Sequence, residues 1–287
     1  MDSKTYRREL LLESYIEKLH EQHGSREESG DWAVKATRQE ILVVGHRGAC
    51  GYEPENTFTS FDLAVKQGAD ILEFDVHLTK DGVPVVIHDD TLQRTTSGSG
   101  KVAQKSLAEI KTFNAAAKKA GHSFEPIPTL EDVVVKYLDK VRLMVEIKHG
   151  SNVYKGIEEK VISVLERAHA IKQSEIISFD FDCIRRVRVL REDVSTGIIF
   201  VGKISDFTRL ANQIGCSALH PSHDYVTSED MRQARETTNL QIYVWTVNGL
   251  EEIQRLCNVL KPDGIVTNYP DRVSREVRKL RLTDDVT

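Results

Sequence analysis

From about residue 40 onward, short apolar runs alternate with longer stretches that carry apolar residues at helical spacing. This alternation is typical of a parallel sheet whose strands are joined by crossover helices. The candidate strands are the runs at 41–46, 70–77, 83–88, 142–147, 174–178, 195–200, 216–220, 241–246 and 263–267.

The second and third candidate strands are separated only by the sequence Thr-Lys-Asp-Gly at residues 79–82. A parallel crossover needs roughly a dozen residues, so this segment is predicted to be a hairpin turn and the run at 83–88 to return antiparallel. The other candidates then form eight parallel strands. We therefore predict a single (β/α)8 TIM barrel over residues 40–287, with a β-hairpin at the barrel mouth and an active site at the carboxyl ends of the strands.

A separate amphipathic helix is predicted over residues 3–22, followed by a polar linker at 24–31. Glutamates interleave with the basic residues of this helix, whereas a membrane-surface helix normally has a polar face rich in Lys and Arg. We expect residues 1–39 to be an N-terminal helical extension and linker. The helix would pack on the barrel itself or on a second copy of the chain, which would make a homo-oligomer.

Composition limits the partners and the location. The 287 residues carry a net charge of -5, which argues against a nucleic-acid partner because such proteins present a basic surface. The four cysteines are far apart in sequence and form no CxxC pair, so they are expected to be reduced thiols. No apolar run has the length of a signal-peptide core or a membrane span, and we expect a cytoplasmic protein.

Two acidic residues share one face of the second candidate strand. Glu73 and Asp75 are two residues apart, and strand side chains alternate between faces, so both carboxylates point the same way. Such a pair is costly unless a positive group lies between the carboxylates. A divalent cation would serve, and oxygen ligands favour Mg²⁺, Ca²⁺ or Mn²⁺ over zinc. The alternative is that the two acids form salt bridges with nearby Lys or Arg.

A second pair on one face, Glu146 and Lys148, ends the candidate strand at 142–147. An isolated pair of this kind in a barrel is most often an internal ion pair. Because Glu73 and Asp75 are expected at the same rim, we prefer Glu146 as a third metal ligand.

Histidines and an arginine complete the predicted site. His46 ends the first strand and His88 follows the hairpin, and a pair of imidazoles can supply the base and the acid that phosphodiester cleavage needs. Arg47 has a planar guanidinium suited to the oxygens of a phosphate, or it forms a salt bridge to a rim acid. The other histidines, His77 and His220 among them, are expected to be structural.

Three further residues have weaker predicted roles. Glu55 and Asn56 precede the first barrel helix, and we expect Asn56 to cap that helix and Glu55 to support the metal or a histidine from a second layer. Trp245 ends the candidate strand at 241–246, and it is either a core aromatic or the wall of a substrate pocket.

At this point the chain resembles the glycerophosphodiester phosphodiesterase family. The resemblance covers about residues 41–273 and rests on several spaced motifs, which are His46-Arg47-Gly48, Pro54-Glu55-Asn56-Thr57, Glu73-Phe74-Asp75-Val76, Thr79-Lys80-Asp81-Gly82, Val85-Val86-Ile87-His88-Asp89, Glu146-Ile147-Lys148, Ser178-Phe179-Asp180, Val244-Trp245-Thr246-Val247-Asn248 and Asp263-Gly264-Ile265-Val266-Thr267-Asn268.

The resemblance implies a (β/α)8 barrel that hydrolyses glycerophosphodiesters, such as glycerophosphocholine or glycerophosphoethanolamine, to glycerol 3-phosphate and an alcohol. It implies His46 and His88 as the acid-base pair and Arg47 as the phosphate ligand with Lys148 beside it. It further implies that Glu73, Asp75 and Glu146 bind Mg²⁺ or Ca²⁺.

Two departures from the family pattern stand out. Asn268 occupies a position where family members often have Asp, which we expect to leave catalysis untouched. The segment between His88 and Leu143 is short, which leaves little room for a large cap and suggests an open mouth.

Several alternatives stay open at this point. The glycerol hydroxyl could attack phosphorus to give a cyclic phosphate, or water could attack directly. A lysophospholipase D or sphingomyelinase D-like enzyme would take an acylated substrate, for which a long apolar groove beside Trp245 would be the sign. A non-catalytic phosphate-binding barrel is the alternative from another class.

Overall fold

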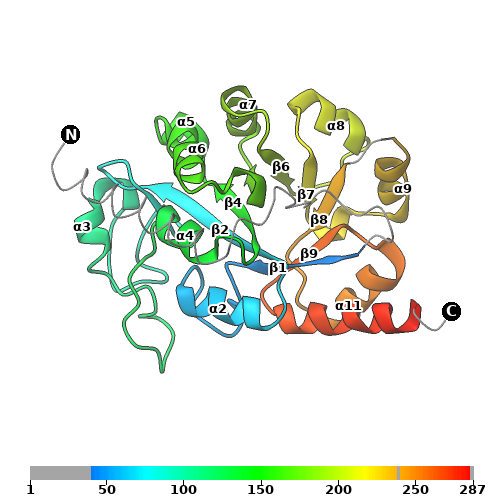
Figure 1. The fold of residues 1–287 in the computed structure, drawn as a ribbon, viewed down its shortest axis with the longest axis horizontal. Coiled ribbons are helices and arrows are strands. Elements are labelled where there is room, and N and C mark those ends of the chain that lie inside the picture. The colour runs from blue at the N-terminus through cyan, green and yellow to red at the C-terminus, as the bar shows by residue number, and fades with distance from the viewer. Residues whose placement is uncertain (1–39, 238–239, 285–287) are drawn as a thin grey trace, which may run out of the picture. The chain divides into compact units, whose positions relative to one another are not determined.

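The computed structural model describes residues 40–237 and 240–284, and these form a closed barrel of parallel strands (Figure 1). The predicted helix at 3–22 lies outside the described residues. The barrel strands are β1 (Leu42–His46), β2 (Ile71–Leu78), β4 (Arg142–Ile147), β5 (Ser174–Ser178), β6 (Ser195–Phe200), β7 (Ala218–Pro221), β8 (Gln241–Val244) and β9 (Gly264–Thr267). They neighbour one another in chain order, and pairing of β1 with both β2 and β9 closes the ring. The predicted (β/α)8 barrel is confirmed.

The hairpin is also present where the sequence predicted it. Strand β3 (Pro84–Val86) runs antiparallel to the last residues of β2. In the turn between them, the Thr79 hydroxyl donates to the Asp81 carboxylate at 2.6 Å and accepts from the backbone N–H of Val83 at 2.9 Å. Gly82 supplies the left-handed backbone that this tight turn requires, with φ of +76°.

Helices cover the outside of the barrel between successive strands (Figure 1). They are α2 (Phe58–Lys66), α4 (Leu130–Tyr137), α5 (Gly150–Val153), α6 (Ile157–Arg167), α7 (Phe181–Leu190), α8 (Phe207–Ile214), α9 (Ser228–Thr237), α10 (Leu250–Arg255) and α11 (Pro270–Asp284). Side-chain oxygens of Thr57, Asp180 and Asp206 accept backbone N–H groups at the starts of α2, α7 and α8, which satisfies donors that have no partner within the helix. In the described part of the chain, none of the helices has the length and apolar character needed to cross a bilayer.

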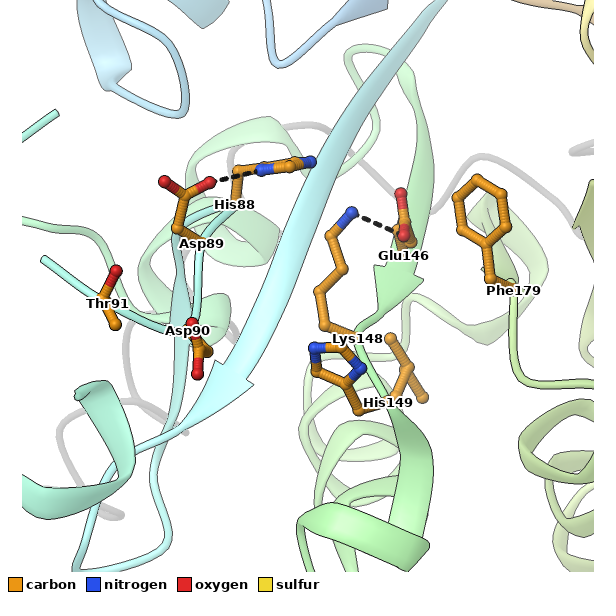
Figure 2. Close-up of a pocket in the computed structure, with 9 residues that line it drawn as sticks. His88, Asp89, Asp90, Thr91, Glu146, Lys148, His149 and Phe179 are labelled. Carbon is orange, nitrogen blue, oxygen red and sulfur yellow. Dashed lines mark hydrogen bonds and ion pairs between the residues drawn. The ribbon is translucent and has the colours of Figure 1, made fainter. Parts of the chain in front are cut away.

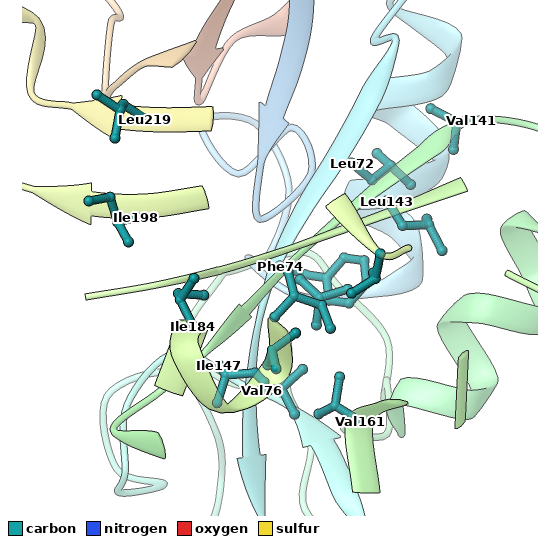
Figure 3. Close-up of a cluster of buried hydrophobic side chains, with 14 of the residues drawn as sticks. Leu72, Phe74, Val76, Val141, Leu143, Ile147, Val161, Ile184, Ile198 and Leu219 are labelled. Carbon is teal, nitrogen blue, oxygen red and sulfur yellow. The ribbon is translucent and has the colours of Figure 1, made fainter. Parts of the chain in front are cut away.

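Alternation along the strands creates two apolar layers. Leu72, Phe74 and Val76 point outward and pack against the helices (Figure 3). Residues at the alternate positions of the strands point into the barrel and form a smaller apolar cluster there. This cluster includes Val44, Ile71, Met144, Ile177, Ile199, Tyr243 and Val266. Inward-pointing residues near the carboxyl ends of the strands lie above this apolar cluster. The polar side chains of β1, β2 and β4 therefore lie at the barrel mouth.

The segment between β3 and α4 folds around a small core of its own. The short helix α3 (Leu107–Ile110) has a capping box formed by Ser106 and Glu109. Its Ile110 belongs to a buried cluster with Val85, Ile87, Leu92, Val102, Ala115 and Ile127. Thr59 at the start of α2 is hydrogen-bonded to Glu125 of this segment. The segment is thus a compact insertion attached beside the mouth.

Candidate active site

The predicted polar residues meet at one cavity at the carboxyl ends of the strands. The cavity has a volume of about 150 Å³, and its lining includes His46, Arg47, Glu73, His88, Glu146, Lys148 and Trp245. Met144, Ile177, Ile199 and Val266 supply apolar surface to the same cavity. The cavity brings together residues from the ends of β1, β2 and β4, from the segment after β3 and from the position directly after β8, as expected for the carboxyl ends of barrel strands.

Three carboxylates form a cluster in this region. Glu73, Asp75 and Glu146 each offer an oxygen, and these oxygens lie within 4.8 Å of one another. The parallel register of β2 and β4 places Asp75 opposite Glu146, and the two-residue period keeps Glu73 on the same face. All three side chains are buried, with exposed fractions of 3%, 0% and 6%.

Burial shapes the protonation of these acids. It raises the pKa of Glu73 well above its usual value, with further increases from the charges of Asp75 and Glu146. Burial also raises the pKa of Glu146 to about 7. Desolvation acts in the same direction on Asp75, but the Lys148 ammonium and the Arg47 guanidinium outweigh it and hold the pKa of Asp75 well below its usual range.

Two cations contact the acidic cluster, so the salt-bridge alternative describes part of the site. Lys148 Nζ lies 2.8 Å from Asp75 Oδ1 and 2.6 Å from Glu146 Oε1. Arg47 Nε lies 3.4 Å from Asp75 Oδ2. Glu73 instead accepts the backbone N–H of Arg47 at 2.9 Å, and within residues 40–237 and 240–284 it forms no ion pair with a side chain.

The donor set fits a divalent cation. Three carboxylates face two protein cations, so the cluster keeps a negative charge when all three acids are ionised. Clustered carboxylate oxygens are the ligands that Mg²⁺, Ca²⁺ and Mn²⁺ prefer. Glu73, Asp75 and Glu146 are therefore the residues that could hold the ion, and Glu73 in particular lacks another positive partner among the described side chains.

His46 is held by a residue from the far end of the chain. Its Nδ1 lies 2.6 Å from Asn268 Oδ1, and because an amide oxygen only accepts, Nδ1 carries the proton and Nε2 has the free lone pair. Burial and the nearby Arg47 lower the pKa of His46 to about 4, so the imidazole is neutral at pH 7. Asn268 thus belongs to the site, because closure of β9 against β1 brings it to His46.

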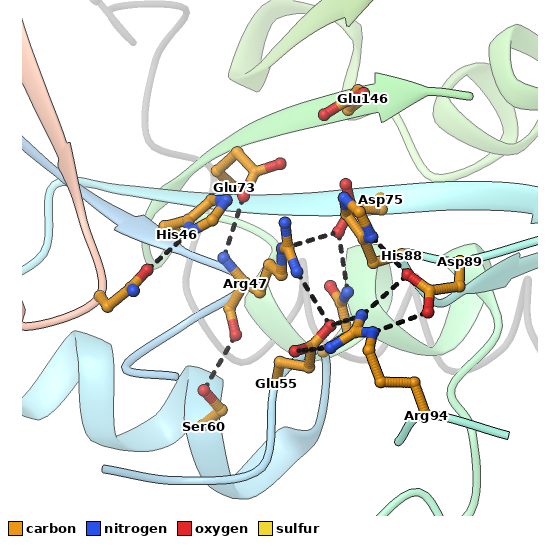
Figure 4. Close-up of polar contacts among 12 residues, drawn as sticks. His46, Arg47, Glu55, Ser60, Glu73, Asp75, His88, Asp89, Arg94 and Glu146 are labelled. Atoms are coloured by element: carbon orange, nitrogen blue, oxygen red, sulfur yellow. Dashed lines mark hydrogen bonds and ion pairs between the residues drawn. The ribbon is translucent and has the colours of Figure 1, made fainter. Parts of the chain in front are cut away.

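A chain of charged contacts, which the sequence analysis missed, orients His88 (Figure 4). Its Nδ1 donates to Asp89 Oδ1 at 2.7 Å. Arg94 binds both oxygens of Asp89 and both oxygens of Glu55 at 2.6–2.9 Å. Burial lowers the pKa of His88, while the neighbouring Asp75 and Asp89 carboxylates act in the opposite direction. The signal available in the sequence was the adjacency of Asp89 to His88.

Glu55 contacts two arginines of the site. It accepts from Arg47 Nη1 at 3.0 Å in addition to its two bonds from Arg94. These cations lower the pKa of Glu55 despite its burial. Glu55 therefore fixes Arg47, which in turn contacts Asp75.

The interpretation of Asn56 as a helix cap was wrong. Thr57 caps α2, with its hydroxyl accepting the backbone N–H of Ser60. Asn56 instead donates from Nδ2 to Asp75 Oδ2 at 2.8 Å, in a buried setting. Its backbone has a φ of +58°, a left-handed conformation that Asn tolerates better than most residues.

Aromatic residues line the other side of the cavity. Trp245 donates its indole N–H to the His220 backbone oxygen at 2.7 Å, and its ring meets that of Phe179 edge to face at 5.6 Å. Phe179, which the sequence analysis did not assign, is 49% exposed. It also lines a neighbouring cavity of about 440 Å³ with His88, Glu146 and Lys148 (Figure 2). Trp245 lines the cavity and also packs against the apolar cluster inside the barrel.

Comparisons with known proteins point to one family. The model of the "Glycerophosphoryl diester phosphodiesterase family" matches residues 46–272. The YhdW protein of Bacillus subtilis (strain 168) is 39% identical over 245 residues, covering 82% of this chain and 98% of the relative. A glycerophosphodiester phosphodiesterase of Caldanaerobacter subterraneus is 36% identical over 241 residues, covering 83% and 98%. The structure of an Oleispira antarctica phosphodiesterase in complex with the product sn-glycerol-3-phosphate aligns with a TM-score of 0.76 at 26% identity, covering 83% of this chain and 97% of that one.

Proposed function

The chain belongs to the glycerophosphoryl diester phosphodiesterase family, and from this we propose that it hydrolyses glycerophosphodiesters to glycerol 3-phosphate and an alcohol with one divalent cation and two histidines. Glycerophosphocholine and glycerophosphoethanolamine are the expected substrates. The observation that carries the proposal is that His46, His88 and the acidic residues Glu73 and Glu146 border a single cavity. The non-catalytic barrel considered from the sequence is set aside, because the relatives are enzymes.

Glu73, Asp75 and Glu146 would hold the cation, which is Mg²⁺ or Ca²⁺, with Mn²⁺ as a further candidate. When bound, such an ion polarises a phosphoryl oxygen and offsets the negative charge that develops on it. Arg47 adds a fixed guanidinium to the same task, because Glu55 and Asp75 orient it. Lys148 stands beside it, and Trp245 forms the wall against the substrate's carbon atoms.

The surroundings of the two imidazoles support different roles for them. His46 is neutral and presents an unprotonated Nε2, which suits a base that takes the proton of the attacking hydroxyl. His88 donates Nδ1–H to Asp89, and that carboxylate acts against the burial that lowers the pKa of His88. His88 therefore suits the acid that protonates the departing alcohol.

The attacking group is either the adjacent glycerol hydroxyl or water. Attack by the glycerol hydroxyl forms a cyclic phosphate, whereas attack by water does not. Single-turnover reactions quenched at short times would trap that species if the glycerol hydroxyl attacks. A substrate analogue without that hydroxyl would be cleaved at full rate only if water attacks directly.

An acylated substrate is the second candidate. The cavity of about 150 Å³ that holds both histidines suits a small glycerol unit. It shares His88, Glu146, Lys148 and Phe179 with the neighbouring cavity of about 440 Å³, which leaves space for a larger group. The apolar floor beside Trp245 is the feature that favours a lipid. Parallel assays with glycerophosphocholine and lysophosphatidylcholine, each below its aggregation threshold, would rank the two classes by kcat/KM.

The proposed function is tested by measuring glycerol 3-phosphate release from glycerophosphocholine by the full-length chain. Chelation should abolish activity, and added Mg²⁺, Ca²⁺ or Mn²⁺ should restore it. His46→Ala and His88→Ala should each lower kcat by about 10²- to 10⁴-fold. His223→Ala is the matched control, since His223 follows β7 on the same face of the barrel but pairs with Glu252 outside both cavities. Unchanged turnover in His46→Ala, or full activity after chelation, would contradict the proposal.

Other properties predicted from the sequence stay predictions. They are an N-terminal extension over residues 1–39, a barrel over 40–287, a homo-oligomer formed through the N-terminal helix, a cytoplasmic location and the lack of a nucleic-acid partner. Sedimentation of the full chain beside a truncation that starts at Glu40 would test the oligomer. The same oligomeric state for both chains would argue against a role of the N-terminal helix in assembly.

A further inference from the structure

His77 connects three parts of the barrel mouth through one imidazole. It lies on β2 on the same face as Asp75, two residues beyond it, and it is fully buried. Its Nε2 lies 2.9 Å from the backbone oxygen of His88. Its Nδ1 lies 2.7 Å from the hydroxyl of Tyr154, which follows α5 in the connection between β4 and α6.

The chemistry of these partners fixes the direction of both hydrogen bonds. A backbone carbonyl only accepts, so His77 Nε2 must carry a proton and donate to His88. In the neutral ring Nδ1 then holds a lone pair and accepts from the Tyr154 hydroxyl. The tyrosine thereby selects the one neutral tautomer in which His77 can hold the His88 carbonyl.

Backbone hydrogen bonds attach the segment that carries His88 to β2. Strand β3 ends at Val86, before His88. The backbone N–H of Ile87 donates to the Asp75 backbone oxygen at 3.0 Å, and one residue further on His77 donates to the backbone oxygen of His88. The His88 side chain, in contrast, has its hydrogen bond to Asp89, which belongs to the same segment. The bond from His77 thus joins a β2 side chain directly to the His88 backbone, in addition to the contacts that run from Asp89 through Arg94 to Glu55.

We propose that Tyr154 and His77 form a positioning pair, which fixes the His88 backbone so that its imidazole reaches the leaving alcohol. Neither residue touches the substrate. The proposal rests on the proposed function in one respect, namely that His88 is the proton donor. It adds a role for a histidine that was expected to be only structural.

The pair acts through the proton donor. The decrease in kcat that follows its removal should therefore depend on the leaving group. Choline leaves as an alkoxide that requires a proton, whereas p-nitrophenol leaves as a stabilised phenolate and does not. His77→Leu should lower kcat for glycerophosphocholine about 50- to 100-fold with little change in KM, because misplaced general acids lose most of their contribution. The same variant should lose less than about fivefold on glycerol 3-phosphoryl p-nitrophenol.

Conservative variants separate positioning from folding. His77→Gln keeps an N–H for the His88 carbonyl and an oxygen for Tyr154, so it should recover at least about a tenth of the wild-type kcat. Tyr154→Phe removes the hydroxyl that selects the tautomer and should lower kcat for glycerophosphocholine about tenfold. Tyr137→Phe is the matched control, because the Tyr137 hydroxyl donates to Asp62 at 2.7 Å and neither residue lines the cavity. It should leave both activities unchanged.

The outcomes distinguish this proposal from the proposed function. His88→Ala provides the reference for a lost proton donor. If His88→Ala shows the leaving-group dependence and Tyr154→Phe and His77→Leu show equal losses on both substrates, the positioning pair is refuted while His88 keeps its role. If wild-type enzyme is active but His88→Ala shows no dependence on the leaving group, the failure lies in the proposed function.

Discussion

Asn56 offers a test of how the backbone and a single amide support the acidic cluster. Its Nδ2 donates to Asp75 at 2.8 Å, the side chain is 3% exposed, and its φ is +58°. Asn56→Ala removes the donor and also places an alanine in the left-handed region. Asn56→Gly removes the donor but adopts that conformation without steric cost. Comparing the two variants separates the hydrogen bond from the backbone.

The expected magnitudes follow from these two losses. A hydrogen bond to a charged group is worth about 1.5–3 kcal/mol. A non-glycine residue in the left-handed region costs roughly 1–2 kcal/mol. Asn56→Ala should therefore lower the free energy of unfolding by about 2.5–5 kcal/mol. Asn56→Gly avoids the steric cost but adds about 0.4–1 kcal/mol of chain entropy, so it should be more stable than the alanine variant by about 1 kcal/mol.

The assay is chemical denaturation of the cation-free chain, followed by calorimetric titration with Mg²⁺, Ca²⁺ and Mn²⁺. Both variants should bind the cation about 10- to 100-fold more weakly, because Asp75 loses a partner that orients it. Asp139 supplies the matched control for the backbone, since it also has a positive φ, of +57°, but lies exposed in the turn after α4. Asp139→Ala and Asp139→Gly should differ by a similar 1 kcal/mol without any effect on cation affinity.

Two results would refute this reasoning. If Asn56→Gly binds the cation as tightly as the wild type, the amide does not orient Asp75 for binding. If Asn56→Ala and Asn56→Gly are equally stable while the Asp139 variants differ, the left-handed backbone at position 56 contributes nothing and the whole loss belongs to the hydrogen bond.

Further predictions concern charge at the same site. The pKa of Glu146, about 7 in the folded chain against 4.5 when exposed, means that the cation-free protein should lose stability as pH rises from 4.5 through 7. Cation affinity should rise over the upper part of that range, because Glu146 loses its proton when the cation binds. Titration calorimetry in two buffers of different ionisation enthalpy should detect this proton release. Cation binding without proton release would contradict the prediction. Lys148→Met should leave Asp75 and Glu146 without their shared cation, so added Mg²⁺ should raise its melting temperature more than that of the wild type. Asn268→Asp should raise the pKa of His46, because a carboxylate stabilises the imidazolium, and should move the acidic limb of the kcat/KM profile to higher pH; an unmoved limb would exclude His46 as the titrating base.

The sequence was sufficient for those features that depend on period and chain order. A two-residue period placed Glu73 and Asp75 on one face, and the short Thr79–Gly82 turn identified the antiparallel β3. Because parallel strands in a barrel end at one rim, the residues at the ends of β1, β2 and β4 could be assigned to one site. The predicted strand boundaries were less accurate. Strand β8 ends at Val244 instead of residue 246, because Trp245 pairs with the loop after β7.

The partners of these residues could not be predicted in the same way. Asn268 lies 222 residues from His46 in sequence, and only the pairing of β9 with β1 brings the two together. Tyr154 reaches His77 across 77 residues through an irregular connection that has no period to analyse. Periodicity reports which way a side chain points, whereas a hydrogen-bond partner depends on how distant elements pack.

The loop after β1 shows most clearly why local preference fails at this site. Arg47 has a φ of +52°, and Asn56, whose backbone N–H donates to the Arg47 oxygen, has a φ of +58°. Asn tolerates this left-handed conformation, whereas Arg seldom adopts it. The left-handed turn at Arg47 nevertheless presents its backbone N–H to Glu73 while its side chain reaches Asp75 and Glu55. Gly48 permits the turn, because a Cβ there would lie 2.6 Å from the Ser60 carbonyl carbon. The conflict between local preference and observed backbone therefore falls where the chain must place a donor against a buried carboxylate.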